Sequence, residues 1–215
     1  MSSRSLYHEG IRSEVVKFIP GKYSKVLEIG CGEGNFSTHF NRQCEYWGVE
    51  PFQAAAGIAS NKLFKVLAGT YEEVYEQLPD GYFDLIICND VIEHMVNYDA
   101  FFQTIKRKMK KDAFIMGSIP NVRFFGNLTE LLIKKDWEYK DSGILDRTHL
   151  RFFTEKSIKR TFTEHEFLIE ELCGICGYSS TNLLKWLQIF ILGGDSRFLQ
   201  FGFRIKYTES LTNQS

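Results

Sequence analysis

The chain has 215 residues, of which 44% are hydrophobic, and its formal net charge at pH 7 is −1. A chain of this length fits one domain with a full apolar core. We therefore expect a single domain over residues 1–215 that ends in a polar tail over 209–215. The near-zero charge argues against bulk binding to nucleic acid or to an anionic membrane. The longest apolar run, Leu183 to Leu192, is too short to span a bilayer.

The cysteines point to a reducing compartment. There are five of them, an odd number, mostly in apolar segments, and the N-terminal residues show no secretory signal pattern. We therefore expect free and mostly buried thiols in a cytoplasmic protein. Cys173 and Cys176 form a lone C-x-x-C motif without the second pair that would complete a tetrahedral site, so no metal is expected.

Hydrophobic periodicity alternates between helices and strands over the first 120 residues. Such alternation predicts a doubly wound parallel sheet, in which ligands bind beyond the carboxyl ends of the strands. The predicted strands cover residues 25–30, 45–50, 64–68, 83–90 and 113–119, and the predicted helices cover 6–19, the segment from a glycine-rich turn to about 42, 54–61, 72–77 and 98–110.

The strict alternation ends after residue 120. We expect a helix over 124–137, an irregular segment over 138–149, a helix over 155–165 capped by Thr154, a strand over 167–173, a helix over 182–192 and a last strand over 198–207. The complete prediction is an α/β fold: a Rossmann-like, doubly wound, mainly parallel seven-stranded sheet with an antiparallel C-terminal edge strand and helices on both faces. A substrate-side insertion is expected over about 121–154. Core packing is the default expectation for the apolar residues of 121–140 and 182–192; a homodimer surface is an alternative for both, a lid for the first and a membrane surface for the second.

The first predicted strand runs directly into Gly30, Gly32 and Gly34. Glycines allow positive φ angles and let a ligand lie against bare backbone, while a helix start offers unpaired N–H groups. Glu50 closes the second predicted strand, where a carboxylate can accept hydrogen bonds from ribose hydroxyls. A dinucleotide fingerprint needs a third glycine at the position of Asn35, which argues against the alternative of a nicotinamide-dependent oxidoreductase.

The pattern E-x-G-x-G-x-G from Glu28 to Gly34 resembles the nucleoside motif of class I methyltransferases that use S-adenosylmethionine. Val49-Glu50-Pro51 resembles the second motif of that family. The segment from Phe83 to His94 resembles its fourth-strand motif, particularly in the subgroup with ubiquinone-biosynthesis methyltransferases. The three matches occur in the family's order, and the resemblance as a whole covers most of the chain. It implies methyl transfer from S-adenosylmethionine.

The resemblance also implies roles for individual residues. Gly30, Cys31 and Gly32 are expected along the methionine and ribose parts of the cofactor. Glu28 is expected to meet its amino group, directly or through water, and Glu50 to hold the ribose hydroxyls. Many relatives have Asp at the position of Thr70, so a direct side-chain contact to the adenine amine is weakened here. The further implied contacts are Pro51 and Phe52 beside the adenine, Gly69, Thr70 and Tyr71 at its edge, and Asn89 and Asp90 beside the methionine part.

Methyl transfer from a sulfonium mainly requires alignment of the acceptor and exclusion of water. A hydroxyl acceptor also needs a base within hydrogen-bond reach. His94, after the fourth strand, and His149, in the insertion, are the candidate catalytic residues, and the sequence leaves the choice open.

The stretch from Asp146 to Thr154 resembles methyltransferases found with bacterial surface-polysaccharide systems. That resemblance implies a small-molecule or glycan acceptor with a hydroxyl group. Arg147 can clamp a phosphate or carboxylate on the substrate. Arg151 and Tyr7 are the other expected substrate-binding residues, and a non-catalytic module that keeps the cofactor pocket is the remaining alternative.

Overall fold

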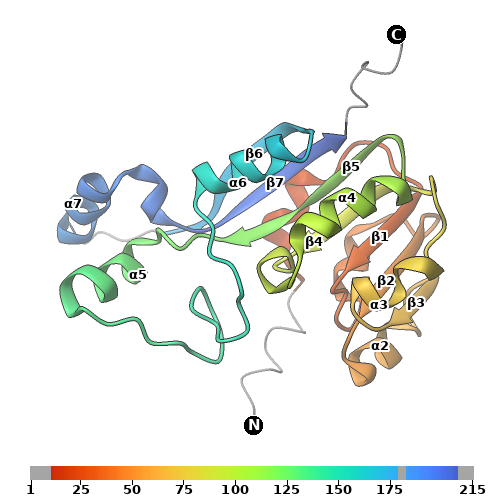
Figure 1. The fold of residues 1–215 in the computed structure, drawn as a ribbon, viewed down its shortest axis with the longest axis horizontal. Helices are drawn as coiled ribbons and strands as arrows, with labels where there is room; N and C mark the ends of the chain where they lie inside the picture. Colours follow the sequence, from red (N-terminus) through yellow and green to blue (C-terminus); the bar gives the residue numbers. More distant parts are fainter. Residues whose placement is uncertain (1–10, 179–182, 208–215) are drawn as a thin grey trace.

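The computed structural model describes residues 11–178 and 183–207, which form a seven-stranded sheet with helices on both faces (Figure 1). The strand order is β3-β2-β1-β4-β5-β7-β6. The strands are β1 (Lys25–Ile29), β2 (Glu45–Glu50), β3 (Lys65–Ala68), β4 (Phe83–Asn89), β5 (Met109–Pro120), β6 (Phe167–Gly177) and β7 (Phe198–Tyr207).

The strand pairing confirms the predicted doubly wound architecture. Strands β1 to β5 pair in parallel, and β7 runs antiparallel between β5 and the edge strand β6. From β1 the chain winds outward through β2 and β3, then returns to β4 and winds the other way. The switch point therefore lies between β1 and β4, and a ligand is expected beyond the carboxyl ends of these two strands.

Helical segments cover the two faces of the sheet. One core cluster joins the sheet to α3, α4 and α6, and a second joins its other face to η1, η2 and α2. The helical segments are η1 (Ser13–Phe18), η2 (Asn35–His39), α2 (Gln53–Ala59), α3 (Tyr71–Val74), η3 (Tyr75–Gln77), η4 (Ile92–His94), α4 (Tyr98–Lys108), α5 (Phe125–Thr129), η5 (Glu130–Lys134), α6 (Glu155–Glu164), α7 (Leu183–Leu192) and η6 (Gly194–Arg197).

Strand β4 is the centre of the core because it is apolar on both sides. Phe83 and Ile86 belong to one cluster, whereas Leu85 and Ile87 belong to the other, and all four are fully buried. Burial of each such side chain contributes about 1.5–3 kcal/mol relative to exposure. The end of β4 is therefore held rigidly, which matters because Asn89 and the residues after it line the site described below.

The prediction of a helix after the glycine turn is wrong. The chain makes only the short 3₁₀ segment η2, preceded by Gly34 at φ 76° and followed by extended Phe40. Residues 11–19 of the expected N-terminal helix likewise contain only the 3₁₀ segment η1, and residues 6–10 lie outside the described part of the chain. Both segments still bury apolar side chains against the sheet, among them Phe18 and Phe36. Hydrophobic spacing located the contacts but not the helix length.

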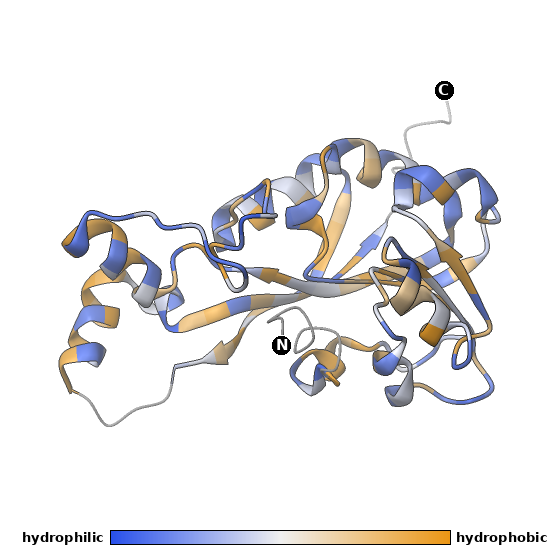
Figure 2. Ribbon diagram, turned by 90° about the horizontal axis from the view of Figure 1, so that it is seen from below, coloured by the Kyte–Doolittle hydropathy of each residue, from blue (hydrophilic) through white to orange (hydrophobic). Residues whose placement is uncertain are grey.

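Two apolar segments differ from the expectation of core packing. The helix expected over 124–137 is shorter: α5 continues into the π-helical turn η5 and ends at Lys135 with φ 59°. Ile133 is 67% exposed, and in α7 Leu183 and Phe190 are 81% and 82% exposed, whereas Ile189 is buried. Figure 1 places α5 and α7 together at one end of the sheet, and Figure 2 shows apolar residues on the helices at that end.

Two smaller expectations concern membranes and thiols. Among the residues described, no helix has the length and apolar character needed to cross a membrane. All five cysteines are free thiols, with Cys31 and Cys88 buried and Cys176 exposed. Cys173 accepts a hydrogen bond from the Lys17 ammonium at 3.0 Å, so the C-x-x-C motif is part of the contact between β6 and the N-terminal segment.

Candidate functional site

The glycine turn after β1 is fixed by backbone contacts to β2. The amides of Gly30 and Cys31 both donate to the Val49 carbonyl, at 2.8 and 3.1 Å. Gly30 has φ 71°, and a Cβ added there would lie 2.8 Å from Val91 Cγ2. Only glycine satisfies both the left-handed backbone and this close approach.

Glu50 ties the end of β2 to the same turn. Its Oε2 accepts from the Gly32 amide at 2.8 Å, and its Oε1 accepts from the Phe52 amide at 2.9 Å. The residue is 3% exposed, so the carboxylate has one fixed orientation. Each oxygen retains a lone pair that can accept a further bond from a ligand hydroxyl.

Glu28 is a second buried carboxyl group beside the turn. Its Oε2 accepts from the Tyr46 hydroxyl at 2.8 Å, and the residue is 3% exposed. Burial raises the pKa of Glu28 to about 8, with the nearby Glu50 adding to the increase and the Tyr46 hydroxyl opposing it. Such a carboxyl group is protonated at neutral pH until a cation arrives beside it.

Asn89 ends β4 opposite these carboxyl groups. Both polar atoms of its side-chain amide are buried and have no hydrogen-bond partner among the described residues. A buried amide normally has partners, and Asn89 lines the cavity. The free amide is therefore placed to meet a polar ligand, as expected for a residue beside the methionine part of the cofactor.

The residues expected on the adenine side line the cavity but differ in exposure and in their contacts. Phe52 is 52% exposed, whereas Tyr71 is 4% exposed, packs against Phe101 and meets Thr104 through its hydroxyl. Thr70 begins α3, and its hydroxyl accepts from the Glu73 amide as part of a capping box. Its side chain therefore caps the start of the helix.

Arg12 is a cavity residue that sequence reasoning missed. Its Nη1 donates to Asp90 Oδ2 at 2.7 Å, and its Nη2 donates to Ser118 Oγ at 2.8 Å. Ser118 and Gln200 also donate to the Asp90 carboxylate. Asp90, expected to contact the cofactor, thus has its carboxylate engaged by three protein groups. An isolated arginine in a short amphipathic segment gives no signal of such a contact in the sequence.

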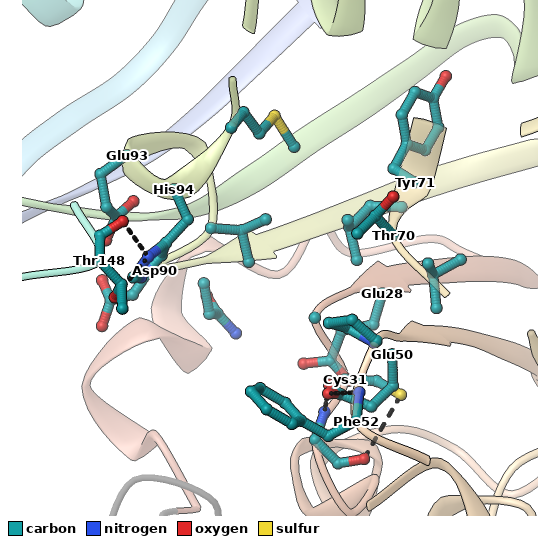
Figure 3. A pocket seen from close by; sticks show the side chains of 18 of the residues that line it. Glu28, Cys31, Glu50, Phe52, Thr70, Tyr71, Asp90, Glu93, His94 and Thr148 are labelled. Carbon is teal, nitrogen blue, oxygen red and sulfur yellow. Dashed lines mark hydrogen bonds between the residues drawn. The ribbon is translucent and has the colours of Figure 1, made fainter. Parts of the chain in front are cut away.

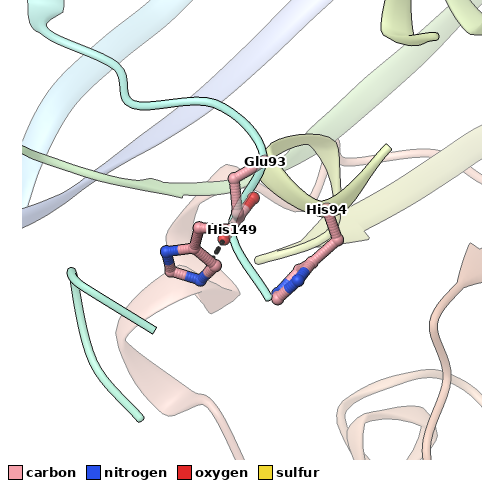
Figure 4. Close-up of side chains that lie close together, drawn as sticks. All are labelled: Glu93, His94 and His149. Carbon is pink, nitrogen blue, oxygen red and sulfur yellow. Dashed lines mark ion pairs between the residues drawn. The ribbon is translucent and has the colours of Figure 1, made fainter. Parts of the chain in front are cut away.

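The two candidate histidines come together from distant parts of the chain. His94 ends η4, His149 lies in the insertion, and their ring centroids are 4.6 Å apart (Figure 4). The Glu93 carbonyl accepts from the amides of Leu150 and Arg151, at 2.8 and 3.2 Å, which fastens the insertion to the end of β4.

Hydrogen bonds determine which ring nitrogen of each neutral imidazole carries the proton. The Thr148 hydroxyl donates to Asp146 Oδ1 at 2.6 Å, so it has no proton for His94; His94 Nδ1 instead donates to the Thr148 carbonyl at 3.2 Å. His149 Nδ1 donates to the Ile144 carbonyl at 2.9 Å. A proton on Nδ1 leaves the Nε2 lone pair of each neutral ring free. Burial, with a contribution from His149, lowers the pKa of His94 and favours its neutral form.

Glu93 is the second site residue that sequence reasoning missed. It is 1% exposed, and neither carboxyl oxygen has a hydrogen-bond partner in the described residues. Its Oε1 lies 4.0 Å from His149 Nε2. Burial, and then Asp90, raise the pKa of Glu93 well above its usual value. The signal was a glutamate next to His94 after an apolar strand, but its role depends on His149, 55 positions further on from His94.

The cofactor-side residues and the histidines line one continuous cavity of about 1020 Å³. Figure 3 shows Glu28, Cys31, Glu50 and Phe52 on one side and Glu93, His94 and Thr148 on the other. This volume suits a nucleoside-sized ligand together with a second molecule.

Of the expected substrate-binding residues, Arg147 reaches this cavity and Arg151 does not. Arg147 forms an ion pair with Asp141 at 2.8 Å. The Arg151 guanidinium instead donates to the carbonyls of Leu150 and Val96 and lies over the Tyr98 ring. Tyr7 lies outside the described residues.

Comparison with known proteins agrees with this geometry. The family model of a methyltransferase domain matches residues 4–172. The chain is 23% identical over 173 residues to the ubiquinone biosynthesis O-methyltransferase of Shewanella sp. (strain ANA-3), covering 75% of this chain and 71% of that protein.

Solved structures share the fold. A SAM-dependent methyltransferase from Archaeoglobus fulgidus superposes with a TM-score of 0.61 at 20% identity, covering 95% of both chains. The 1,6-didemethyltoxoflavin-N1-methyltransferase of Burkholderia thailandensis, solved with bound 1,6-didemethyltoxoflavin and S-adenosylhomocysteine, gives a TM-score of 0.64 at 13% identity, covering 96% of this chain and 82% of that one. The family model spans most of the chain, and the sheet order agrees with it. This chain therefore belongs to the methyltransferase domain family and is an S-adenosylmethionine-dependent methyltransferase.

Proposed function

We propose that this enzyme transfers the methyl group to a hydroxyl oxygen of a small-molecule or glycan acceptor. The observation that carries the proposal is the single cavity with two unlike walls. One wall consists of the glycine turn and buried carboxyl groups, and the other presents two imidazoles with free lone pairs. A methyl donor and a protic acceptor need these two environments side by side.

The cofactor wall fits a nucleoside joined to an amino acid. Glu50 is oriented to accept from two ribose hydroxyls, because both of its oxygens are already fixed by backbone amides. Glu28 and the unpartnered amide of Asn89 are assigned to the amino-acid end, where an ammonium and a carboxylate need partners. Phe52 and Thr70 are assigned to the adenine end of the same wall.

The acceptor wall is assigned to activation of the hydroxyl. S-adenosylmethionine supplies an electrophilic methyl group on a positively charged sulfur. His94 and His149 direct their free lone pairs to the acceptor, and the Asp146–Thr148 contact keeps the His94 proton on Nδ1, so that Nε2 is the atom that can accept a proton. Glu93 is buried, but His94 and Thr148 are exposed, so the acceptor must displace water from this wall when it binds.

The curated relative supports oxygen as the acceptor atom, since it is a ubiquinone biosynthesis O-methyltransferase. Two imidazoles near the methyl position also suit a hydroxyl, which must lose a proton, better than an amine that enters as the free base. Arg147 at the cavity wall suits an acceptor that carries a phosphate or a carboxylate, such as a nucleotide-linked sugar.

The proposal is tested with labelled S-adenosylmethionine and a panel of acceptors. The panel contains matched pairs of hydroxyl and amino compounds, including nucleotide-linked sugars, and methylated products are identified by mass spectrometry. We expect transfer to hydroxyl compounds, and transfer confined to amines would contradict the oxygen assignment. Two results together would instead favour a non-catalytic module. The protein would bind the cofactor without methyl transfer to any acceptor, and a His94→Ala, His149→Ala double variant would still bind its protein partner.

A further inference from the structure

The insertion and the end of β4 bring together three potential metal ligands that no motif joins in the sequence. One ligating atom from each of Glu93, His94 and His149 lies within 4.8 Å of the other two. Glu93 and His94 follow the central strand, whereas His149 comes from the insertion, and Figure 4 shows the carboxyl group beside the two imidazole rings.

A second observation is independent of this clustering. Both carboxyl oxygens of Glu93 are buried and unpartnered among the described residues, and one of them points toward His149 Nε2 at 4.0 Å. A buried carboxyl group without any hydrogen bond is costly. Because the carboxyl group faces the Nε2 lone pair of His149 and has a ligating atom of His94 within 4.8 Å, a positive ion is the partner that would satisfy all three side chains.

The hydrogen bonds around the rings have the arrangement found at metal sites. Ligating histidines usually donate their second N–H to a carbonyl or carboxylate, which fixes the ring and its tautomer. Here His94 Nδ1 donates to the Thr148 carbonyl and His149 Nδ1 donates to the Ile144 carbonyl. The residues that orient the rings are thus already in place.

We propose that Glu93, His94 and His149 bind a divalent transition-series cation that takes the acceptor hydroxyl as a further ligand. Two imidazoles and one carboxylate favour ions such as Zn²⁺, Mn²⁺ or Fe²⁺ over Mg²⁺ or Ca²⁺. Ligands on one such ion, with bonds of about 2.0–2.2 Å, lie about 3–3.5 Å apart. The three ligand atoms, which lie within 4.8 Å of one another, must therefore close by up to roughly 1–2 Å. Three protein ligands leave positions open on the cavity side.

This inference rests on the proposed function and changes how the hydroxyl is activated: the Nε2 lone pairs of His94 and His149 hold the ion, and the ion, in place of the imidazoles, acidifies the hydroxyl. A coordinated hydroxyl is more acidic, so its O–H bond breaks and the proton passes to water at the cavity mouth. The oxygen then forms a bond to the methyl carbon while the carbon–sulfur bond breaks, leaving its electron pair on sulfur. The expected acceptors are therefore hydroxyl compounds that coordinate metals well, such as vicinal diols or catechols. The sequence alone predicted no metal, because the three ligands come together only in the folded chain.

The test is a Co²⁺ and Zn²⁺ titration of tag-free protein after chelator treatment. We expect one ion per chain, a visible d–d absorption band for Co²⁺, and affinity more than about 10-fold weaker in Glu93→Gln and His149→Ala. Glu76→Gln and His39→Ala remove the same residue types elsewhere and should bind like the wild type. Absence of binding, equal binding by Glu93→Gln and His149→Ala, or an intense thiolate charge-transfer band that locates the ion at Cys173 and Cys176 would overturn the proposal.

Calorimetry with S-adenosylhomocysteine on the same proteins separates this inference from the proposed function. Glu93→Gln and His149→Ala should bind it within about threefold of the wild type, because neither residue belongs to the cofactor wall. A wild-type chain that binds Co²⁺ but not S-adenosylhomocysteine would refute the cofactor assignment alone. The reverse result would refute the metal site and leave the methyl-transfer proposal standing.

Discussion

The two walls of the cavity are built in different ways. The cofactor wall consists of backbone turns and carboxyl groups at the ends of β1 and β2, whose positions follow from strand register. The acceptor wall depends on an irregular insertion, anchored through the Glu93 carbonyl to the amides of Leu150 and Arg151. In the proposed assignment, regular elements thus position the residues for the cofactor, and an irregular segment positions those for the acceptor.

The largest effect that separates the two walls is expected at His149. We expect His149→Ala to lower the rate of methyl transfer by about 10²- to 10⁴-fold, the usual contribution of a positioned proton-transfer or activating group. S-adenosylhomocysteine affinity should stay unchanged, since the ring lies on the acceptor wall. The measurement is single-turnover transfer to an acceptor from the panel, with His39→Ala as control. Full activity in His149→Ala would remove the histidine from the chemistry.

Glu50→Ala is the complementary change on the cofactor wall. The variant loses two charge-assisted bonds to ribose and frees the amides of Gly32 and Phe52, so we expect a loss of about 2–4 kcal/mol, or roughly 30- to 1000-fold in affinity. Calorimetric titration with S-adenosylhomocysteine measures it. Glu72→Gln, a milder change at an exposed cavity residue, should bind normally, and wild-type affinity in Glu50→Ala would contradict the ribose assignment.

Gly30→Ala tests the geometry of the turn itself. An alanine at φ 71° with its Cβ 2.8 Å from Val91 Cγ2 should cost about 1–3 kcal/mol of folding free energy, or about 3–10 °C in Tm. Gly57→Ala is the matched control, because Gly57 is exposed in α2 with nothing within 4 Å of the added Cβ. That change should leave Tm unchanged or raise it slightly. Equal Tm values for the two variants would show that the turn tolerates a side chain.

The smallest expected effect is the number of protons that the protein releases when S-adenosylhomocysteine binds. At pH 6.5 Glu28 is protonated because its pKa is about 8, and an approaching ligand ammonium must displace that proton. Binding of S-adenosylhomocysteine should therefore release close to one proton and should strengthen as the pH rises toward 8. Calorimetry in buffers of different ionisation enthalpy detects this release, and Glu28→Gln should abolish it. Identical enthalpies in all buffers for the wild type would contradict the pairing.

The sequence predicted the sheet and the residues that line the cavity at its carboxyl edge, because both depend on local patterns. Alternating strands and helices imply a parallel sheet, whose strands all end at the same edge, and this brings Gly30, Glu50 and Asn89 to that edge. The lengths of η1 and η2 were not predictable from apolar spacing, since 3₁₀ and α-helical turns bury the same first residues. The exposure of α7 was also missed, because an apolar helix in a sequence does not reveal what covers it.

The acceptor wall was predicted only in part, for a physical reason. His94 and His149 were recognised singly as candidates, but their contact with Glu93 depends on how the insertion folds back across the end of β4. The bond between Arg12 and Asp90 joins residues 78 positions apart by the same kind of long-range packing. Arg151 looked equivalent to Arg147 in sequence, but its guanidinium points to the Val96 carbonyl.

A crystal structure of the complex with S-adenosylhomocysteine tests the account most directly. We predict ribose hydroxyls within hydrogen-bond distance of Glu50, the amino group near Glu28 and Asn89, and the sulfur facing the space in front of His94 and His149. A ribose bound away from Glu50, or a sulfur directed away from the two imidazoles, would contradict the division of the cavity into a cofactor wall and an acceptor wall.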